Sequence, residues 1–159
     1  MEEYEYSFNV LDIQPYLNYC KQNGYILKSI KKQNRKVYEC VESRSKIARI
    51  TTTWDDMGNA ETVLDFKNVT KNKDDLKVSN ESQTLKVTDE NRDAILSILE
   101  TLNFKQSADN TRTRYVYVSN DIKFEIDDYL SPNKPVVALE GKKSIVDKAY
   151  LEICKLFNN

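Results

Sequence analysis

The sequence predicts an antiparallel α+β fold in which about eight β-strands are accompanied by three helices. Most stretches rich in β-branched and aromatic residues alternate polar and apolar side chains with a period of two, which is typical of strands with one buried face. The links between these stretches are mostly short enough for hairpins. The alternation of strand and helix that builds a parallel sheet is absent. We therefore expect a single domain over residues 1–159.

In the first part of the chain, local patterns predict a strand, a helix and then a run of strands. Residues 3–10 alternate acidic and aromatic side chains and are expected to form a strand. A helix should follow, with Asp12 as its cap, Pro15 in its first turn and Gly24 at its end. Residues 25–54 are expected to form two or more strands, because β-branched residues are frequent there.

The middle of the chain contains a turn, two predicted strands and a polar segment. Residues 55–59 read as a turn, and residues 62–69 return as a strand. Residues 71–80 are polar and charged, so they are expected to form a loop. Residues 83–87 are predicted to add a short strand.

The last third of the chain combines two helices with a hairpin. Residues 91–102 carry leucine and isoleucine at helical spacing, and Thr88 is a candidate cap for that helix. Residues 112–128 form the clearest predicted hairpin, and residues 136–140 a short strand. Gly141 leads into a final helix. The apolar stripe of this helix is expected to comprise Ile145, Val146, Ala149, Ile153 and Leu156.

The composition excludes several classes of protein. Lysine and arginine number 24, aspartate and glutamate number 25, and the formal net charge is −1. Without a basic excess, no nucleic-acid partner is expected. No apolar run approaches the roughly 20 residues that span a bilayer, so no membrane association is expected either.

Histidine and cysteine usage narrows the chemistry further. The chain has no histidine, which excludes histidine-based nucleophile activation, acid–base catalysis and zinc ligation. Its three cysteines, Cys20, Cys40 and Cys154, are widely spaced, and we expect them to be free, mostly buried thiols in a reducing, cytoplasmic compartment.

Charged residues recur on one face of the predicted strands, while the opposite face is apolar. Two arrangements fit this pattern. In the first, the charges face solvent and the apolar face forms the core. In the second, the strands close into a barrel whose lumen holds the charges and whose apolar outer face packs under helices. The charged positions are Glu3, Glu5, Arg49, Glu61, Asp65, Lys67, Arg112, Arg114, Lys123, Glu125, Asp127 and Glu140.

A lumen that holds both signs of charge would suit a polyanion bound together with a divalent cation. Arginine offers two parallel donors to phosphoryl oxygens, and lysine offers a point charge. Carboxylates bind hard cations such as Mg²⁺ or Mn²⁺. Phosphoryl transfer needs positioning and charge neutralisation more than a nucleophilic side chain, so the lack of histidine does not exclude it.

The order of motifs resembles that of the CYTH proteins, also called triphosphate tunnel metalloenzymes, which include class IV adenylate cyclases, thiamine triphosphatases and inorganic triphosphatases. The likeness extends over nearly the whole chain. In chain order, it comprises residues 3–7 (an ExExK-like strand), 33–38 (Q-x-x-x-Y-like), 48–51 (R-x-R-like), 64–67 (the tunnel-lysine strand), 102–104 (L-G-F-like), 111–115 (K-x-R-like), 126–129 (D-x-x-like) and 138–141 (E-x-E-like).

The resemblance implies an eight-stranded antiparallel tunnel, flanked by about three helices, that binds a small-molecule triphosphate or nucleotide with Mg²⁺ or Mn²⁺. The protein would act as a monomer or homodimer. The residues implied to bind phosphate are Arg49, Lys67, Arg112, Arg114 and Lys123. The residues implied to bind metal are Glu3, Glu5, Asp127 and Glu140.

Four positions depart from the family pattern. Ser7 stands where the opening motif has lysine, Thr51 where a second arginine is usual, and Ala138 where the last motif has its first glutamate. Gln83 lies near a place where another acid is expected. Losing one contact of a preorganised electrostatic site can cost roughly 10²–10³ in rate, so the catalytic residues stay open.

Three functions are therefore left open. The first is a metal-dependent phosphohydrolase acting on an inorganic or organic triphosphate, with class IV conversion of ATP to cyclic AMP as its variant. The second is a tunnel that binds a nucleotide or polyphosphate without turnover. The third is an interaction domain whose charges face outward.

Overall fold

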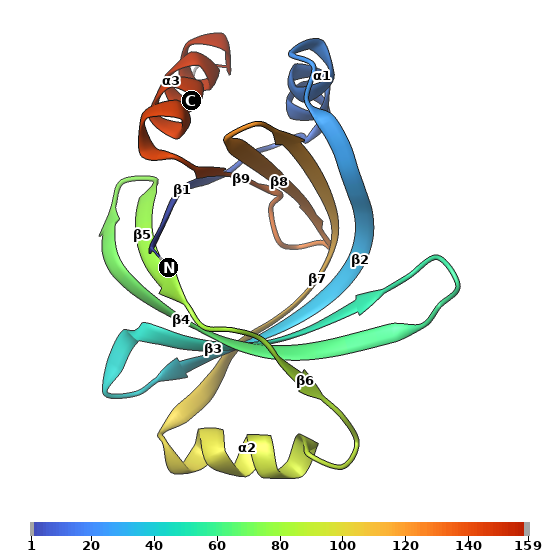
Figure 1. Ribbon diagram of the computed structural model, residues 1–159, viewed down its shortest axis with the longest axis vertical. Helices are drawn as coiled ribbons and strands as arrows, with labels where there is room; N and C mark the ends of the chain where they lie inside the picture. Colours follow the sequence, from blue (N-terminus) through green and yellow to red (C-terminus); the bar gives the residue numbers. More distant parts are fainter. Residues whose placement is uncertain (1, 158–159) are drawn as a thin grey trace.

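The computed structural model describes residues 2–157, which contain nine β-strands and three α-helices (Figure 1). The strands are β1 (Glu2–Asn9), β2 (Ile26–Cys40), β3 (Ser43–Trp54), β4 (Ala60–Lys73), β5 (Leu76–Glu81), β6 (Leu85–Val87), β7 (Phe104–Ser119), β8 (Ile122–Tyr129) and β9 (Val136–Gly141). The helices are α1 (Gln14–Gln22), α2 (Arg92–Thr101) and α3 (Lys143–Phe157).

Eight of the strands form a closed antiparallel barrel. They follow one another in the order β3, β2, β7, β8, β9, β1, β5, β4, and pairing of β4 with β3 closes the ring. The short strand β6 pairs with residues 62–64 of β4 outside this ring. The predicted fold class, an antiparallel eight-stranded barrel with three helices, is confirmed.

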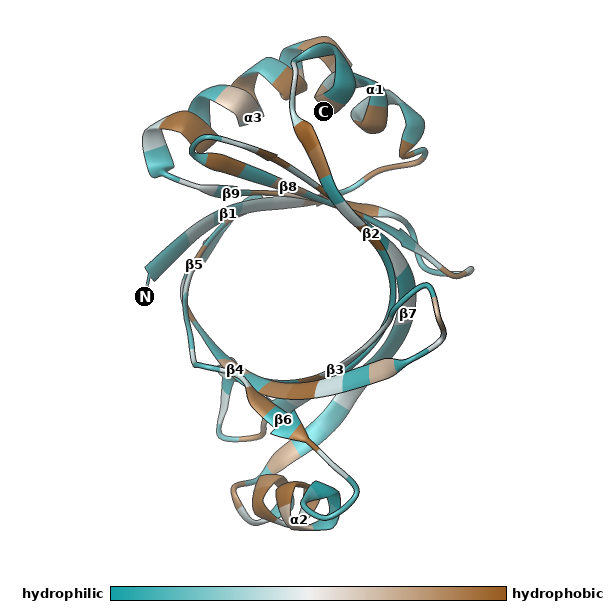
Figure 2. Ribbon diagram, turned by 45° about the vertical axis from the view of Figure 1, so that its right-hand side comes forward, coloured by the Kyte–Doolittle hydropathy of each residue, from teal (hydrophilic) through white to brown (hydrophobic). Residues whose placement is uncertain are grey.

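The larger apolar core lies outside the barrel, under α1 and α3 (Figure 2). Outward-facing side chains of β8 and β9, such as Phe124, Ile126 and Leu139, are almost completely buried there. They contact Cys20 of α1 and Ile153 of α3, which are equally buried. Because the helices cover the apolar outer face of these strands, the opposite, polar face lines the interior of the barrel.

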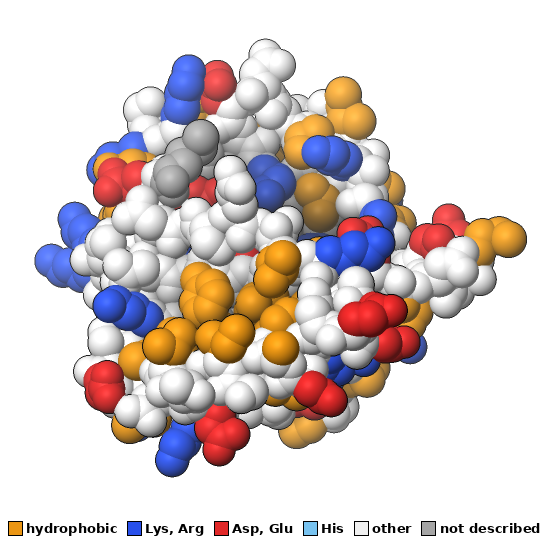
Figure 3. Space-filling view, turned by 60° about the horizontal axis from the view of Figure 1, so that its bottom comes forward, with side chains coloured by type: hydrophobic (Ala, Val, Ile, Leu, Met, Phe, Trp, Pro, Cys, Tyr) orange, Lys and Arg blue, Asp and Glu red, His pale blue; other side chains and the backbone are white. Residues whose placement is uncertain are grey.

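A smaller apolar core lies between α2 and the far side of the barrel. Ile95 and Leu99 of α2 pack on Ala48 of β3 and Leu64 of β4. Other apolar side chains in this region are exposed. Figure 3 shows hydrophobic side chains gathered on one face of the molecule, with charged ones around them. Exposed apolar residues of α2 and β6 and of the turn after α2 are Leu85, Leu96, Ile98 and Leu102.

Three predictions about local structure after the first helix are wrong. Residues 71–80 are not a loop, because β4 continues to Lys73 and β5 begins at Leu76. The helix α2 is preceded by Asn91 as its N-cap residue, and Thr88 contributes its backbone carbonyl, not its hydroxyl, to the first turn. In α3, Leu156 is exposed, and its place against the core is taken by the aromatic ring of Phe157.

The predicted cap of the first helix is also one residue off, because the N-cap residue of α1 is Ile13 and not Asp12. The carboxylate of Asp12 accepts a hydrogen bond from the backbone N–H of Gln14, the first residue of α1, at 2.9 Å. Pro15 lies in the first turn, and Gly24 follows the helix with a φ of +74°. The three cysteines are free; Cys20 and Cys40 are buried and Cys154 is partly buried. None of the helices within residues 2–157 combines the length and apolarity needed to cross a membrane.

Candidate functional site: a charged tunnel through the barrel

The interior of the barrel encloses a cavity of about 810 Å³ that is lined by charged side chains. The arrangement in which the strand charges face solvent is therefore wrong for most of them; Glu61, which is exposed and outside the lining, is the exception. Among the described residues, nine basic and seven acidic side chains line the cavity. The acidic ones are Glu3, Glu5, Asp65, Glu81, Glu125, Asp127 and Glu140, and the basic ones are Arg35, Arg44, Arg49, Lys67, Lys71, Lys77, Arg112, Arg114 and Lys123.

Arg49 of β3 is held on one side of the cavity by two carboxylates. Its guanidinium donates two hydrogen bonds to the directly opposite Asp65 of β4, one of them from Nε at 2.9 Å. A third goes to Oε1 of Glu81 on β5 at 2.9 Å. These carboxylates outweigh the burial of Arg49 and raise the pKa of its guanidinium, so the side chain stays charged.

A second arginine group lies on β7. Arg114 donates to both oxygens of Asp127 on β8, at 2.7 and 2.9 Å, and to Glu125 at 2.8 Å. Arg112 lies 3.8 Å from Asp127 and donates to the side chains of Gln33 and Tyr129. Both arginines face the lumen because they are two residues apart on the same strand.

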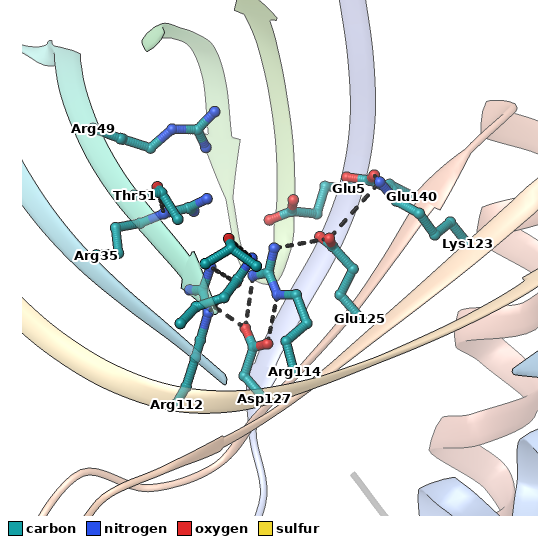
Figure 4. Close-up of polar contacts among 12 residues, drawn as sticks. Glu5, Arg35, Arg49, Thr51, Arg112, Arg114, Lys123, Glu125, Asp127 and Glu140 are labelled. Atoms are coloured by element: carbon teal, nitrogen blue, oxygen red, sulfur yellow. Dashed lines mark hydrogen bonds and ion pairs between the residues drawn. The ribbon is translucent and has the colours of Figure 1, made fainter. Parts of the chain in front are cut away.

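Two lysines connect these groups to the acidic side of the cavity. The ammonium group of Lys67 lies 3.8 Å from carboxylate oxygens of both Glu5 and Glu81. The ammonium group of Lys123 forms an ion pair with Glu140 and lies 3.7 Å from Glu125. The ion pairs thus form two groups, one from Arg49 to Glu5 and one from Lys123 to Arg114. Figure 4 shows acids and arginines facing each other across the cavity.

Glu5, Glu125 and Glu140 form a cluster that we call the carboxylate triad. One oxygen from each lies within 4.8 Å of the others. The three belong to the neighbouring strands β1, β8 and β9, whose register brings them together. Burial and the nearby Glu125 raise the pKa of Glu140 to about 7, because like charges crowd there.

This donor set fits a hard divalent cation. Mg²⁺ and Mn²⁺ prefer oxygen ligands, and one or two carboxylates with retained waters are the usual protein contribution for Mg²⁺. A cation at the triad would also relieve the repulsion that raises the pKa of Glu140.

On the opposite wall, Arg35 of β2 points into the cavity beside Thr51 of β3 (Figure 4). The two residues are directly paired across the strands, and Nε of Arg35 donates to the hydroxyl oxygen of Thr51 at 2.9 Å. Burial and the nearby arginines Arg112, Arg49 and Arg114 lower the pKa of Arg35 to about 9, so it is still protonated at neutral pH.

All nine residues that the resemblance assigned to phosphate or metal binding line this one cavity. Within it, Glu5 and Glu140 belong to the triad, Glu3 lines the cavity outside the triad, and Asp127 contacts arginines. The individual roles stay predictions. Of the four positions that depart from the family pattern, Ser7 and Ala138 line the cavity and Thr51 holds Arg35, whereas Gln83 is exposed and outside the lining.

The sequence assigns no phosphate- or metal-binding role to several of the charged lining residues, among them Glu125, Glu81 and Arg35. Glu125 was placed on the charged face but not among the metal ligands, although it lies two residues from Asp127 on the same strand. Glu81 was missed because the segment before it read as a loop. Arg35 was missed because both faces of its strand carry polar residues. The available signal was its spacing of two from Gln33 and Val37, which places the three side chains on one face of the strand.

No model of a protein family matches the sequence, and no curated protein matches it. Solved structures do resemble it. A protein from Pyrococcus horikoshii OT3 has a TM-score of 0.72 at 15% identity, with 96% of this chain and 88% of that chain covered. A structure of the Schizosaccharomyces pombe Mediator head module has a TM-score of 0.62 at 11% identity, with 99% of this chain and 95% of that chain covered. A putative adenylate cyclase from Vibrio parahaemolyticus has a TM-score of 0.60 at 13% identity, with 97% of this chain and 85% of that chain covered.

These neighbours have different descriptions, so the likeness bears on fold and not on activity. At such low identities, the comparisons establish that this chain has the same β-barrel fold as these proteins, a putative adenylate cyclase among them.

Proposed function

We propose that the barrel binds a triphosphate together with Mg²⁺ or Mn²⁺ and hydrolyses it to a diphosphate and inorganic phosphate. One observation carries this proposal: the cavity inside the barrel has the carboxylate triad on one wall and arginines on the other. A triphosphate bound with a divalent cation is a ligand that uses both sides at once.

The charge balance of the cavity supports a polyanion. Its lining has two more basic than acidic side chains, and a divalent cation at the triad would add two further positive charges. A ligand with several negative charges would therefore neutralise the interior, whereas a neutral ligand would leave the excess uncompensated.

The residues of the tunnel would divide the work between positioning and charge neutralisation. Glu5, Glu125 and Glu140 would hold the cation, which when bound supplies a positive charge that draws electron density from the phosphoryl oxygens. Arg112 and Arg114 would donate to those oxygens, where negative charge spreads in the transition state. The oxygen of the attacking water would bond to the terminal phosphorus and release a proton to bulk water, while the bridging P–O bond breaks and its electron pair leaves on the diphosphate.

Two other outcomes have support of their own. Cyclisation of ATP, with release of pyrophosphate, is favoured by the likeness to a protein described as a putative adenylate cyclase. Binding without turnover is favoured by the departures at Ser7 and Ala138, both of which lie in the cavity, and by the carboxylates that already pair with most of the arginines.

A panel of tripolyphosphate, ATP and thiamine triphosphate with Mg²⁺ and with Mn²⁺ tests the proposal. We expect metal-dependent phosphate release, which Glu140→Gln should lower roughly 10²–10³-fold. Glu61→Gln removes the same charge at an exposed position outside the cavity lining and should leave the rate unchanged.

Each alternative has its own result in the same panel. If ATP gives cyclic AMP and pyrophosphate, the reaction is cyclisation and not hydrolysis. Heat of binding in calorimetry without any product would leave a binding protein. Neither product nor heat with any of the three compounds would contradict the proposal altogether.

A further inference from the structure

Arg35 differs from every other arginine that lines the cavity. Arg49 and Arg114 donate to carboxylates, Arg112 lies 3.8 Å from Asp127, and Arg44 near the rim lies 3.6 Å from a glutamate. Arg35 forms no ion pair with any described residue. Among the described residues, Arg35 is therefore the one arginine of the cavity lining without a carboxylate within ion-pair distance.

The guanidinium of Arg35 is nevertheless held in place. Its Nε donates to the hydroxyl of Thr51, which is buried and lies directly opposite on β3. The two terminal nitrogens of Arg35 have no hydrogen-bond partner among residues 2–157. Every fully buried side-chain nitrogen of these residues does have a partner, so the two terminal nitrogens must be accessible from the cavity that Arg35 lines. Fixing Nε thus leaves the two terminal nitrogens open to a ligand.

The surroundings of Arg35 make its charge unfavourable until an anion arrives. Burial and three neighbouring arginines oppose the charge, and Asp65 offsets them only in part. Such a cation is poorly solvated and lies near other positive charges. An anion would therefore bind more favourably at Arg35 than at an arginine that is already paired with a carboxylate.

We propose that Arg35, positioned by Thr51, binds a phosphoryl group of the triphosphate and contributes more to its affinity than any of the carboxylate-paired arginines. This inference rests on the proposed function, because it assumes a triphosphate in the tunnel. It adds a specific prediction: the dominant phosphate contact comes from β2, a strand to which the sequence pattern assigned no site residue.

Tripolyphosphate binding, measured by calorimetry with and without Mg²⁺, tests the role of Arg35. We expect Arg35→Gln to weaken binding about 10- to 100-fold, as expected for the loss of a hydrogen-bonded charge. Arg44→Gln is the matched control, because it removes the same charge from an exposed arginine at the rim of the same cavity. It should weaken binding less than threefold at about 0.15 M salt, where exposed charges are screened.

A stability measurement separates binding from a structural role. Without ligand, Arg35→Gln should unfold at the same or a higher temperature than the wild type, because it removes a repelled cation. Thr51→Val keeps the side-chain shape but removes the hydroxyl that holds Nε, so it should weaken tripolyphosphate binding less than Arg35→Gln does.

The outcomes distinguish the two proposals. If Arg35→Gln binds tripolyphosphate as tightly as the wild type does, the role of Arg35 is overturned and the proposed function stands. A variant that binds poorly but has also lost stability without ligand would likewise overturn it, by showing a structural role. A wild type that binds no tripolyphosphate with either metal would overturn the proposed function and this inference with it.

Discussion

Asp127 is the one buried carboxylate among the described residues that line the tunnel, with only 3% of its surface exposed. It accepts two hydrogen bonds from Arg114 and lies close to Arg112. A buried carboxylate is tolerated only with such partners, and its removal leaves buried cations without compensation. The contacts of Asp127 therefore indicate that it stabilises the two arginines, whether or not a metal is bound.

Replacing Asp127 by asparagine should lower the free energy of unfolding by about 3 kcal/mol in the absence of metal. The adjacent Asp128 is exposed, so Asp128→Asn should change it by less than about 0.5 kcal/mol. Urea denaturation of both variants in EDTA measures the difference. A variant at position 127 that is as stable as the one at position 128 would show that the arginines do not depend on this carboxylate.

At the scale of elements, the helix α3 is attached to the barrel by two tyrosines. The rings of Tyr6 on β1 and Tyr150 on α3 stack with centroids 4.1 Å apart. The hydroxyl of Tyr150 donates to Asp75, in the turn between β4 and β5, at 2.5 Å. The strands β4 and β5 carry Lys67, Lys77 and Glu81 of the tunnel wall, so this contact joins the outer helix to the lining of the site.

Removing only the hydroxyl, with Tyr150→Phe, keeps the ring stack and deletes the contact to Asp75. We expect a loss of about 1–2 kcal/mol in the free energy of unfolding, with faster hydrogen exchange at residues 74–77. Tyr4→Phe is the control, because the hydroxyl of Tyr4 only reaches the exposed Glu2. If exchange in the turn is unchanged, α3 does not restrain this hairpin.

The strands that sequence reasoning placed correctly have a clear contrast between their two faces. In β1 and β8, acidic residues alternate with aromatic or branched ones, so both the strand and its charged face could be predicted. The segment from Lys71 to Asn80 lacks this contrast, because lumen-facing charges and a charged turn resemble a loop. Partners such as Glu81 for Arg49 depend on register between distant strands, which local patterns do not contain.

On the scale of the whole molecule, the barrel reverses the usual arrangement of a small β protein. Its apolar side chains face outward into two cores beneath the helices, and its charges face inward. Closing eight strands around so many charges brings like charges together as well as opposite ones, most clearly at Glu5, Glu125 and Glu140. The fold thus contains repulsion that a bound cation would remove, so cation binding should be visible in the stability of the whole barrel.

Adding Mn²⁺ or Mg²⁺ should therefore raise the melting temperature of the protein, and EDTA should reverse the change. A cation at 100 times its dissociation constant contributes about 2.7 kcal/mol, which corresponds to roughly 5–10 °C for a chain of this length. Glu125→Gln should abolish most of the shift, whereas Glu61→Gln, which removes an exposed acid outside the cavity lining, should retain it. An equal shift in the wild type and in Glu125→Gln would contradict the prediction, by showing that Glu125 does not bind the cation.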